Sequence, residues 1–118
     1  MNIIQEKSFE LAKEIVVIYQ YLTHEKREYV LSRQLLRSGT SIGANAAEAG
    51  AGQTRKDFIS KMNISYKEAQ ETLFWLRLLK ETGMIEESRV NRASDLSVEV
   101  CKILWSIIKT ATNNLHKT

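Results

Sequence analysis

The chain has 118 residues, of which 43% are hydrophobic and 26% are charged, and it contains no proline and only five glycines. This length supports one hydrophobic core but not two, and the single cysteine excludes an internal disulfide framework. The formal net charge of +3 is modest for a nucleic-acid-binding protein, and the composition favours helices, so we expect one all-α domain spanning residues 1–118.

No targeting or membrane-spanning segment is predicted. The first ten residues, MNIIQEKSFE, lack the basic-then-apolar pattern of a secretory signal, and the apolar run at residues 15–19 is too short to cross a bilayer. A chain with one cysteine also suits a reducing compartment. We therefore expect a cytoplasmic protein that makes no membrane contact.

Hydrophobic periodicity predicts two helices in the first half of the chain. The first spans residues 3–22, and its predicted core-facing stripe comprises Phe9, Ala12, Val16, Tyr19 and Leu22. After the polar segment THEKR, the second helix spans residues 27–50 and ends at GAGQ. Its predicted stripe comprises Leu31, Leu35, Ser38, Ile42, Asn45 and Ala49.

Two further helices are predicted in the second half. The third spans residues 54–82, with Thr54 as its N-cap and Gly83 just past its end, and its stripe comprises Phe58, Met62, Tyr66, Ala69, Leu73 and Leu76. The fourth spans residues 87–114, with Leu96, Val100, Ile103, Ile107 and Ala111 as its stripe. Because the connections are short, neighbouring helices must be antiparallel, which predicts an up-down-up-down four-helix bundle.

The segment RSGTSIGANAAEAGAG, residues 37–52, permits two interpretations: a phosphate-binding glycine loop or a helix with unusually small side chains. A P-loop requires GxxxxGK followed by Ser or Thr, and the dinucleotide pattern GxGxxG fails because Arg55 stands where its third glycine is needed. Gly39, Gly43, Ala47 and Ala51 instead recur every four residues. This row predicts a thin helix that another helix approaches closely.

Three polar residues are spaced along the same predicted helix: Ser41, Asn45 and Glu48. If they face inward, each requires a partner such as a backbone carbonyl, Arg37 or Lys61. The favoured interpretation is a structural hydrogen-bond network, and the alternative is a ligand-binding role.

The third and fourth helices carry more apolar surface than one bundle needs. Ile64, Trp75 and Leu78 fall nearly opposite the core-facing stripe of the third helix, with Glu71 between them. On the fourth helix, Val98, Cys101 and Trp105 also lie away from the main stripe. A surface row that includes a tryptophan is typical of an interface, so we expect a homo-oligomer with Ile64, Glu71, Trp75 and Leu78 as interface candidates.

Positive charge is concentrated in one part of the chain. Residues 26–61 contain seven basic and three acidic residues, a local charge of +4. The candidate nucleic-acid-binding residues are Arg33, Arg37, Arg55, Lys56 and Lys61. The alternative is an ordinary solvated face in which these residues pair with Glu28, Glu48 and Asp57.

No signature of catalysis or cofactor binding is present in the sequence. Neither His24 nor His116 completes a Glu-x-x-His pair, so a carboxylate-bridged metal site is not supported. Cys101 lies in an apolar helical segment, where a small packing residue is the usual interpretation. We predict no catalytic residue, no metal and no cofactor, and therefore a protein that is not an enzyme.

The segments QLLRSGTSIGANAAEAG and DFISKMNISYKEAQETLFWLRLL resemble a bacterial family of four-helix-bundle proteins associated with intervening sequences of large-subunit ribosomal RNA genes. The pattern includes Arg37, Ser38, Ser41, Ile42, Asn45, Glu48, Asp57, Phe58, Glu71, Trp75 and Leu76. The resemblance implies a four-helix bundle and a ring-like homopentamer. The family is related to accessory variability proteins of diversity-generating retroelements, which act with a reverse transcriptase and its template RNA, so a reverse transcriptase is one candidate protein partner.

Two functional hypotheses follow. The first is a non-catalytic oligomer that binds RNA or DNA through its basic surface, with little sequence preference because no base-reading motif is present. The second is a protein-interaction scaffold or accessory subunit with no nucleic-acid contact. Reversing the charges of Arg33 and Lys56 separates the two, because only the first hypothesis requires these charges.

Overall fold

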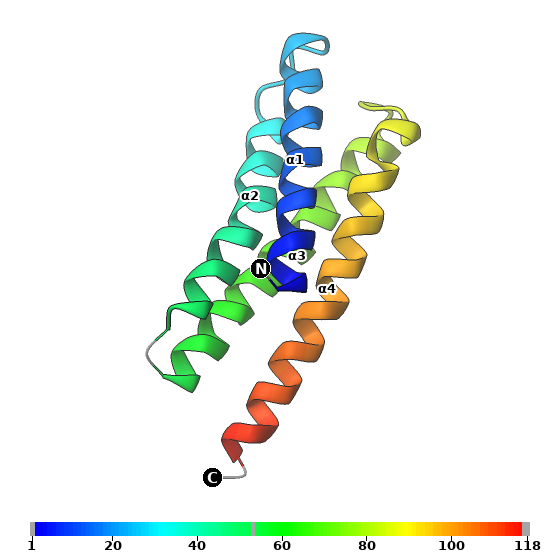
Figure 1. Cartoon of the computed structure of the whole chain (residues 1–118). Coiled ribbons are helices and arrows are strands. Elements are labelled where there is room, and N and C mark those ends of the chain that lie inside the picture. The colour runs from blue at the N-terminus through cyan, green and yellow to red at the C-terminus, as the bar shows by residue number, and fades with distance from the viewer. Residues whose placement is uncertain (1, 53, 117–118) are drawn as a thin grey trace.

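The computed structural model describes residues 2–52 and 54–116, and the bundle consists of four antiparallel helices (Figure 1). They are α1 (Ile3–His24), α2 (Leu31–Gly50), α3 (Arg55–Glu81) and α4 (Glu87–His116). Each helix packs against the next in chain order, and α4 returns to pack against α1. Within the described residues there is no strand, which confirms the predicted all-α fold.

The core lies on the bundle axis and receives fully buried leucines from every helix: Leu11, Leu35, Leu76 and Leu104. It also contains serine and threonine hydroxyls, for example those of Ser65, Thr72 and Ser97, which donate hydrogen bonds to backbone carbonyls. No buried polar side-chain atom in the described part of the chain lacks a partner, so these hydroxyls do not carry an uncompensated desolvation cost.

The predicted core-facing stripe of the first helix is wrong. The buried residues of α1 are Ile4, Ser8, Leu11, Ile15, Ile18, Leu22 and Thr23. Phe9 is 63% exposed and Val16 is 38% exposed, and of the predicted set only Leu22 is buried. Helix α1 carries two apolar stripes that both repeat at three- and four-residue steps, so periodicity alone does not determine which of them faces the core.

The other three stripes agree better with the structure. In α2, Leu35, Ser38, Ile42 and Ala49 are buried, and in α3 the same holds for Met62, Ala69 and Leu76. In α4 the predicted stripe is rotated slightly from the true core face. Leu96 and Val100 are buried, but Leu104 and Ile108 take the core positions expected of Ile103 and Ile107, which are half-buried.

The second helix begins at Leu31, four residues later than predicted. Arg27 has a φ of 55°, in the left-handed region, so a right-handed helix cannot pass through it. The carboxylate of Glu28 accepts hydrogen bonds from the backbone N–H groups of Val30, Leu31 and Ser32 at 3.0, 2.9 and 2.7 Å. Glu28 therefore caps α2 from outside the helix.

This cap makes the stability of the fold dependent on pH. Burial raises the pKa of Glu28, but the backbone and hydroxyl hydrogen bonds from Leu31, Ser32 and Val30 outweigh it, so the pKa lies below its ordinary value of 4.5. A carboxyl whose pKa is lowered by folding stabilises the folded state above its unfolded pKa. That stabilisation is lost as the pH falls through the lower folded value.

We expect Glu28→Gln to lower the free energy of unfolding by about 1 kcal/mol at pH 7, because the cap loses its charged acceptor. The difference from wild type should shrink as the pH falls through the lowered folded pKa of Glu28, because the wild-type carboxyl is then itself protonated. Urea unfolding followed by circular dichroism across an acidic pH series measures this. Glu25→Gln is the control, because Glu25 is exposed and its side chain makes no hydrogen bond to the described residues. An equal effect of both substitutions at pH 7 would contradict the cap.

The predicted limits of the last two helices are close to the observed ones. The hydroxyl of Thr54 accepts a hydrogen bond from the N–H of Asp57 at 3.0 Å, which confirms Thr54 as the N-cap of α3. Gly83 has a φ of +74°, a conformation that glycine adopts without strain just past a helix end. Helix α4 extends two residues beyond the predicted limit, to His116.

Residues 37–50 of the small-residue segment lie in the continuous helix α2, with Ala51 as its C-cap, which confirms the thin-helix interpretation and excludes the phosphate-binding loop. A Cβ atom added at Gly39 would lie 2.7 Å from Cγ1 of Ile15, and one added at Gly43 would lie 3.1 Å from Oγ of Ser8. Helix α1 therefore packs directly on the backbone of α2 at these two positions. Ala47 and Ala51 continue the row but remain exposed.

Candidate functional site

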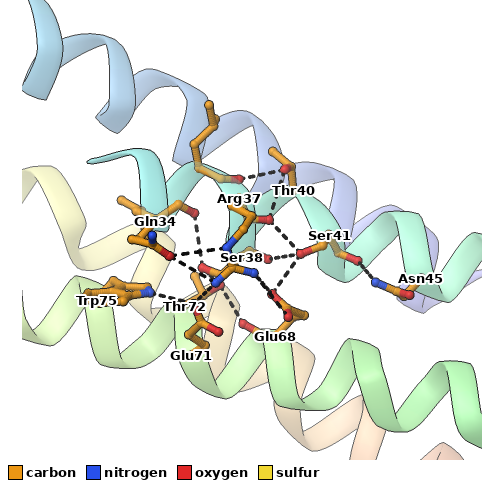
Figure 2. A network of polar contacts seen from close by, with 12 residues as sticks. Gln34, Arg37, Ser38, Thr40, Ser41, Asn45, Glu68, Glu71, Thr72 and Trp75 are labelled. Carbon is orange, nitrogen blue, oxygen red and sulfur yellow. Dashed lines mark hydrogen bonds and ion pairs between the residues drawn. The ribbon is translucent and has the colours of Figure 1, made fainter. Parts of the chain in front are cut away.

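A network of polar side chains joins α2 to α3 on one side of the bundle (Figure 2). The guanidinium of Arg37 lies between two carboxylates, pairing with Glu68 at 3.1 Å and also with Glu71. The indole N–H of Trp75 donates to Glu71 at 2.9 Å, and the hydroxyl of Ser41 donates to Glu68 at 3.0 Å. Each carboxylate thus receives one charged and one neutral donor, which fixes the register of the two helices.

The three predicted network residues divide between this cluster and a separate ion pair. The single O–H of Ser41 is shared between Glu68 and the carbonyl of Arg37, and the side-chain amide of Asn45 donates to the carbonyl of Ser41 at 2.8 Å. Glu48 takes no part in the network; it is exposed and pairs with Lys61 at 3.6 Å. The contacts of Ser41 and Asn45 therefore fit the structural interpretation.

The five candidate basic residues differ in whether they are already paired. Arg37 is held by Glu68 and Glu71, and Lys61 is held by Glu48. Arg33, Arg55 and Lys56 are exposed and make no ion pair with the described residues. Of the acidic partners considered from sequence, only Glu48 pairs with one of the five.

The same residues do not form one patch on a single subunit. Arg33 lies in the first turn of α2, whereas Arg55 and Lys56 begin α3, which starts beside the last turn of α2. The 17 steps from Arg33 to Gly50 correspond to about 26 Å along a helix. Of the three unpaired candidate cations, the structure therefore places one near one end of the bundle and two near the other.

A cleft of about 650 Å³ lies at the end that carries Arg55. Ion pairs of Lys7 with Glu99 and of Arg92 with Glu10 and Glu14 align α1 with the first half of α4. The second half of α4 therefore continues past the N-terminus of α1, and Figure 1 shows this overhang. The cleft is lined by residues of the α3 start and the α4 end: Gly52, Thr54, Arg55, Phe58, Ser106, Ile107, Thr110, Ala111 and Asn114.

Sequence reasoning missed this cleft for a physical reason. It exists because α1 has 22 residues and α4 has 30, so that α1 stops short of the α4 end. The polar residues at positions 106, 110 and 114 recur every four residues, and this spacing is the only sequence signal for a shared face.

The interface candidates from sequence are only partly accessible. Ile64 is 40% exposed, and Trp75 and Leu78 are half-buried. Glu71 is engaged by Arg37 and Trp75 within the chain, so its polar groups do not require a partner subunit.

Larger exposed apolar side chains lie on several surfaces, including Val30 before α2, which is 70% exposed, and Phe74 of α3, which is 57% exposed and contacts Trp75. Two further surfaces lie on α1 and α4. On α1, Ile3, Phe9 and Val17 are at least half exposed. On α4, Trp105 is 56% exposed and contacts Tyr66 of α3 through a ring-centroid distance of 6.2 Å, with Val98 nearby on the same helix. The apolar surface of α1 was not predicted from the sequence, because Phe9 and Val16, which are exposed, were assigned to the core.

No group of three or more metal-ligating side chains gathers among the described residues. Burial raises the pKa of the Cys101 thiol, so this cysteine is protonated at neutral pH and is a poor nucleophile. None of the four helices, within residues 2–52 and 54–116, is long and apolar enough to cross a membrane.

Residues 1–106 match the family model described as 23S rRNA-intervening sequence protein. The fold is similar to the crystal structure of a protein of unknown function from the S23 ribosomal protein family of Bacteroides thetaiotaomicron, with a TM-score of 0.88 and 48% sequence identity. That similarity covers 91% of this chain and 99% of the other. No curated protein sequence matches the chain.

Proposed function

Because the chain belongs to the 23S rRNA-intervening sequence protein family, we propose that it is a non-catalytic subunit of a ring-like homo-oligomer that binds RNA. The observation that carries this proposal is that some of the candidate basic residues have no ion-pair partner. Arg33, Arg55 and Lys56 are exposed without an ion-pair partner among the described residues, so their charge is available to phosphates. Arg37 and Lys61 already have carboxylate partners and are not assigned to RNA.

Self-association is supported by two of the exposed apolar surfaces, those on α1 and α4. Phe9 and Val17 lie on α1, whereas Trp105 and Val98 lie on α4. When two different surfaces of one subunit meet, the contact is heterologous, and a heterologous contact that closes produces a ring. The family resemblance gives five subunits for such a ring.

A ring also strengthens weak phosphate contacts. Each subunit presents Arg33, Arg55 and Lys56 in two places, and a closed assembly repeats them around its axis, so that one RNA molecule contacts several subunits at once. Affinity of this origin falls as salt rises and depends little on base sequence. The similar crystal structure comes from a protein placed in a ribosomal protein family, which favours RNA over DNA as the partner.

The test is light scattering coupled to size exclusion, run on the protein alone and with a structured RNA across a salt series. We expect an oligomer that takes up RNA at low salt and releases it as salt rises. Arg33→Glu with Lys56→Glu should abolish uptake while leaving the oligomer intact, and Glu6→Gln with Glu87→Gln serves as the control at two exposed acidic positions. An intact oligomer that ignores RNA at every salt concentration would favour the scaffold hypothesis, with a protein such as a reverse transcriptase as partner.

A further inference from the structure

Resting on the RNA-binding function proposed above, we infer that the cleft between the start of α3 and the end of α4 binds one unpaired nucleotide of single-stranded RNA. The cleft has a volume of about 650 Å³, within the range of small-molecule sites. It combines an unpaired cation, an apolar floor with an aromatic ring, and a row of neutral polar side chains.

The charge of the cleft favours an anionic ligand. Arg55 lines it and makes no ion pair with the described residues, and no acidic residue is part of its lining. Helix α4 has no acidic residue from position 100 to position 116, whereas it carries Lys102 and Lys109 there. Asp57 is the nearest carboxylate in the sequence, and Lys56 beside it offsets its charge. A phosphate is therefore attracted to the Arg55 side of the cleft.

The polar side chains on the opposite wall are suited to a base and a ribose. Ser106, Thr110 and Asn114 are spaced by four residues, which places them on one face of α4, and all three line the cleft. Their side chains make no hydrogen bond to the described residues. By contrast, Thr72 and Ser97 elsewhere in the bundle use their hydroxyls to cap backbone carbonyls. The free hydroxyls and amide supply both donors and acceptors without charge.

The floor of the cleft is apolar. Phe58 and Ile107 are half-buried there, next to the small side chain of Ala111. Single-stranded nucleic acids are commonly held by stacking of a base on an aromatic ring while the backbone follows positive charge. A base inside a duplex is already stacked and paired, so it cannot enter this cleft without being extruded. The arrangement therefore predicts a preference for single strands over duplex.

The test compares two RNA probes by fluorescence anisotropy: a labelled single-stranded octaadenylate and the same strand paired with its complement. Ala111→Leu fills the cleft without changing charge, and Arg55→Gln removes the cation. We expect each to weaken single-strand binding by about tenfold, in line with the loss of one stacked base or one phosphate contact. Ala111→Leu should leave duplex binding within about twofold of wild type, because it removes only stacking.

Two controls match these variants. Ser60→Leu adds the same side chain at an exposed position of α3 that does not line the cleft, and Lys67→Gln removes one exposed positive charge from the same helix. Circular dichroism verifies that each variant is folded. Because Arg55 is exposed, its substitution should not affect folding, and it tests the site even if Ala111→Leu fails to fold. Wild-type single-strand affinity in Arg55→Gln and in folded Ala111→Leu would overturn the cleft site and leave the proposed function standing. Failure of the wild-type protein to bind either probe would overturn the cleft site, whereas the proposed function is overturned only if the structured RNA is not bound at low salt either.

Discussion

Replacing Gly39 with valine is expected to lower the free energy of unfolding by about 3 kcal/mol, a large fraction of the roughly 5–15 kcal/mol typical of a small domain. The added Cβ would lie 2.7 and 2.8 Å from the two γ-carbons of Ile15, which is itself fully buried. Ile15 is branched at Cβ and rotates little, so the clash is relieved only if α1 moves away from α2. That movement opens the core along the whole contact.

The control for this experiment is Gly50→Ala. Outside the backbone of its own helix and its chain neighbours, a Cβ at Gly50 meets no atom of the described residues within 4 Å, and the position is the last residue of α2. Alanine there should leave stability unchanged or raise it by up to about 1 kcal/mol, because it is the better helix former. Chemical unfolding followed by circular dichroism gives both values. A Gly39→Val protein as stable as wild type would show that α1 does not approach α2 as closely as described.

Replacing Trp105 with aspartate is expected to convert the proposed homo-oligomer to monomers. The tryptophan is 56% exposed and its ring contacts that of Tyr66. In an assembly this ring becomes a central contact, and such residues contribute at least about 2 kcal/mol per interface. A buried aspartate in its place would also lack a partner and would oppose association further. Because the side chain is exposed in the single subunit, the bundle itself should remain folded.

Light scattering of the Trp105→Asp protein measures this, with the helical signal by circular dichroism as evidence of folding. Asn91→Asp is the control: it adds the same charge at an exposed position near the other end of α4. A Trp105→Asp protein that keeps the wild-type mass would place the subunit contact on another surface. Trp75 is a weaker target, because its indole is half-buried and bonded to Glu71, so its loss disturbs the α2–α3 network as well.

The ion pairs of Arg37 change the functional interpretation of the basic segment, residues 26–61. From sequence, Arg33 and Arg37 stand one helical turn apart and resemble a pair of phosphate contacts. In the structure, Arg37 is held by Glu68 and Glu71, residues that lie more than 30 positions away in the chain. Its role is to join two helices, and the charge available to a ligand is smaller and lies nearer the ends of the bundle.

The amino-acid sequence by itself determined the number of helices, their limits to within a few residues and their antiparallel order. These features depend on local signals, such as the Thr54 cap, the Gly83 turn and the three-to-four-residue spacing of apolar side chains. The small residues of α2 also indicated a close helix contact in advance, because only the absence of a side chain at Gly39 and Gly43 permits one.

Tertiary structure alone decided which face of α1 is buried, which basic residues are free and where a cleft opens. Helix α1 has two stripes with the same period, and the choice between them depends on how the other three helices fill the core. Whether a cation is free depends on carboxylates brought close by the antiparallel packing of α2 on α3, as with Arg37 and Glu68. The cleft depends on the difference in length between α1 and α4. Local sequence signals specify the length of each helix, but the difference opens a cleft only when the two helices are packed together.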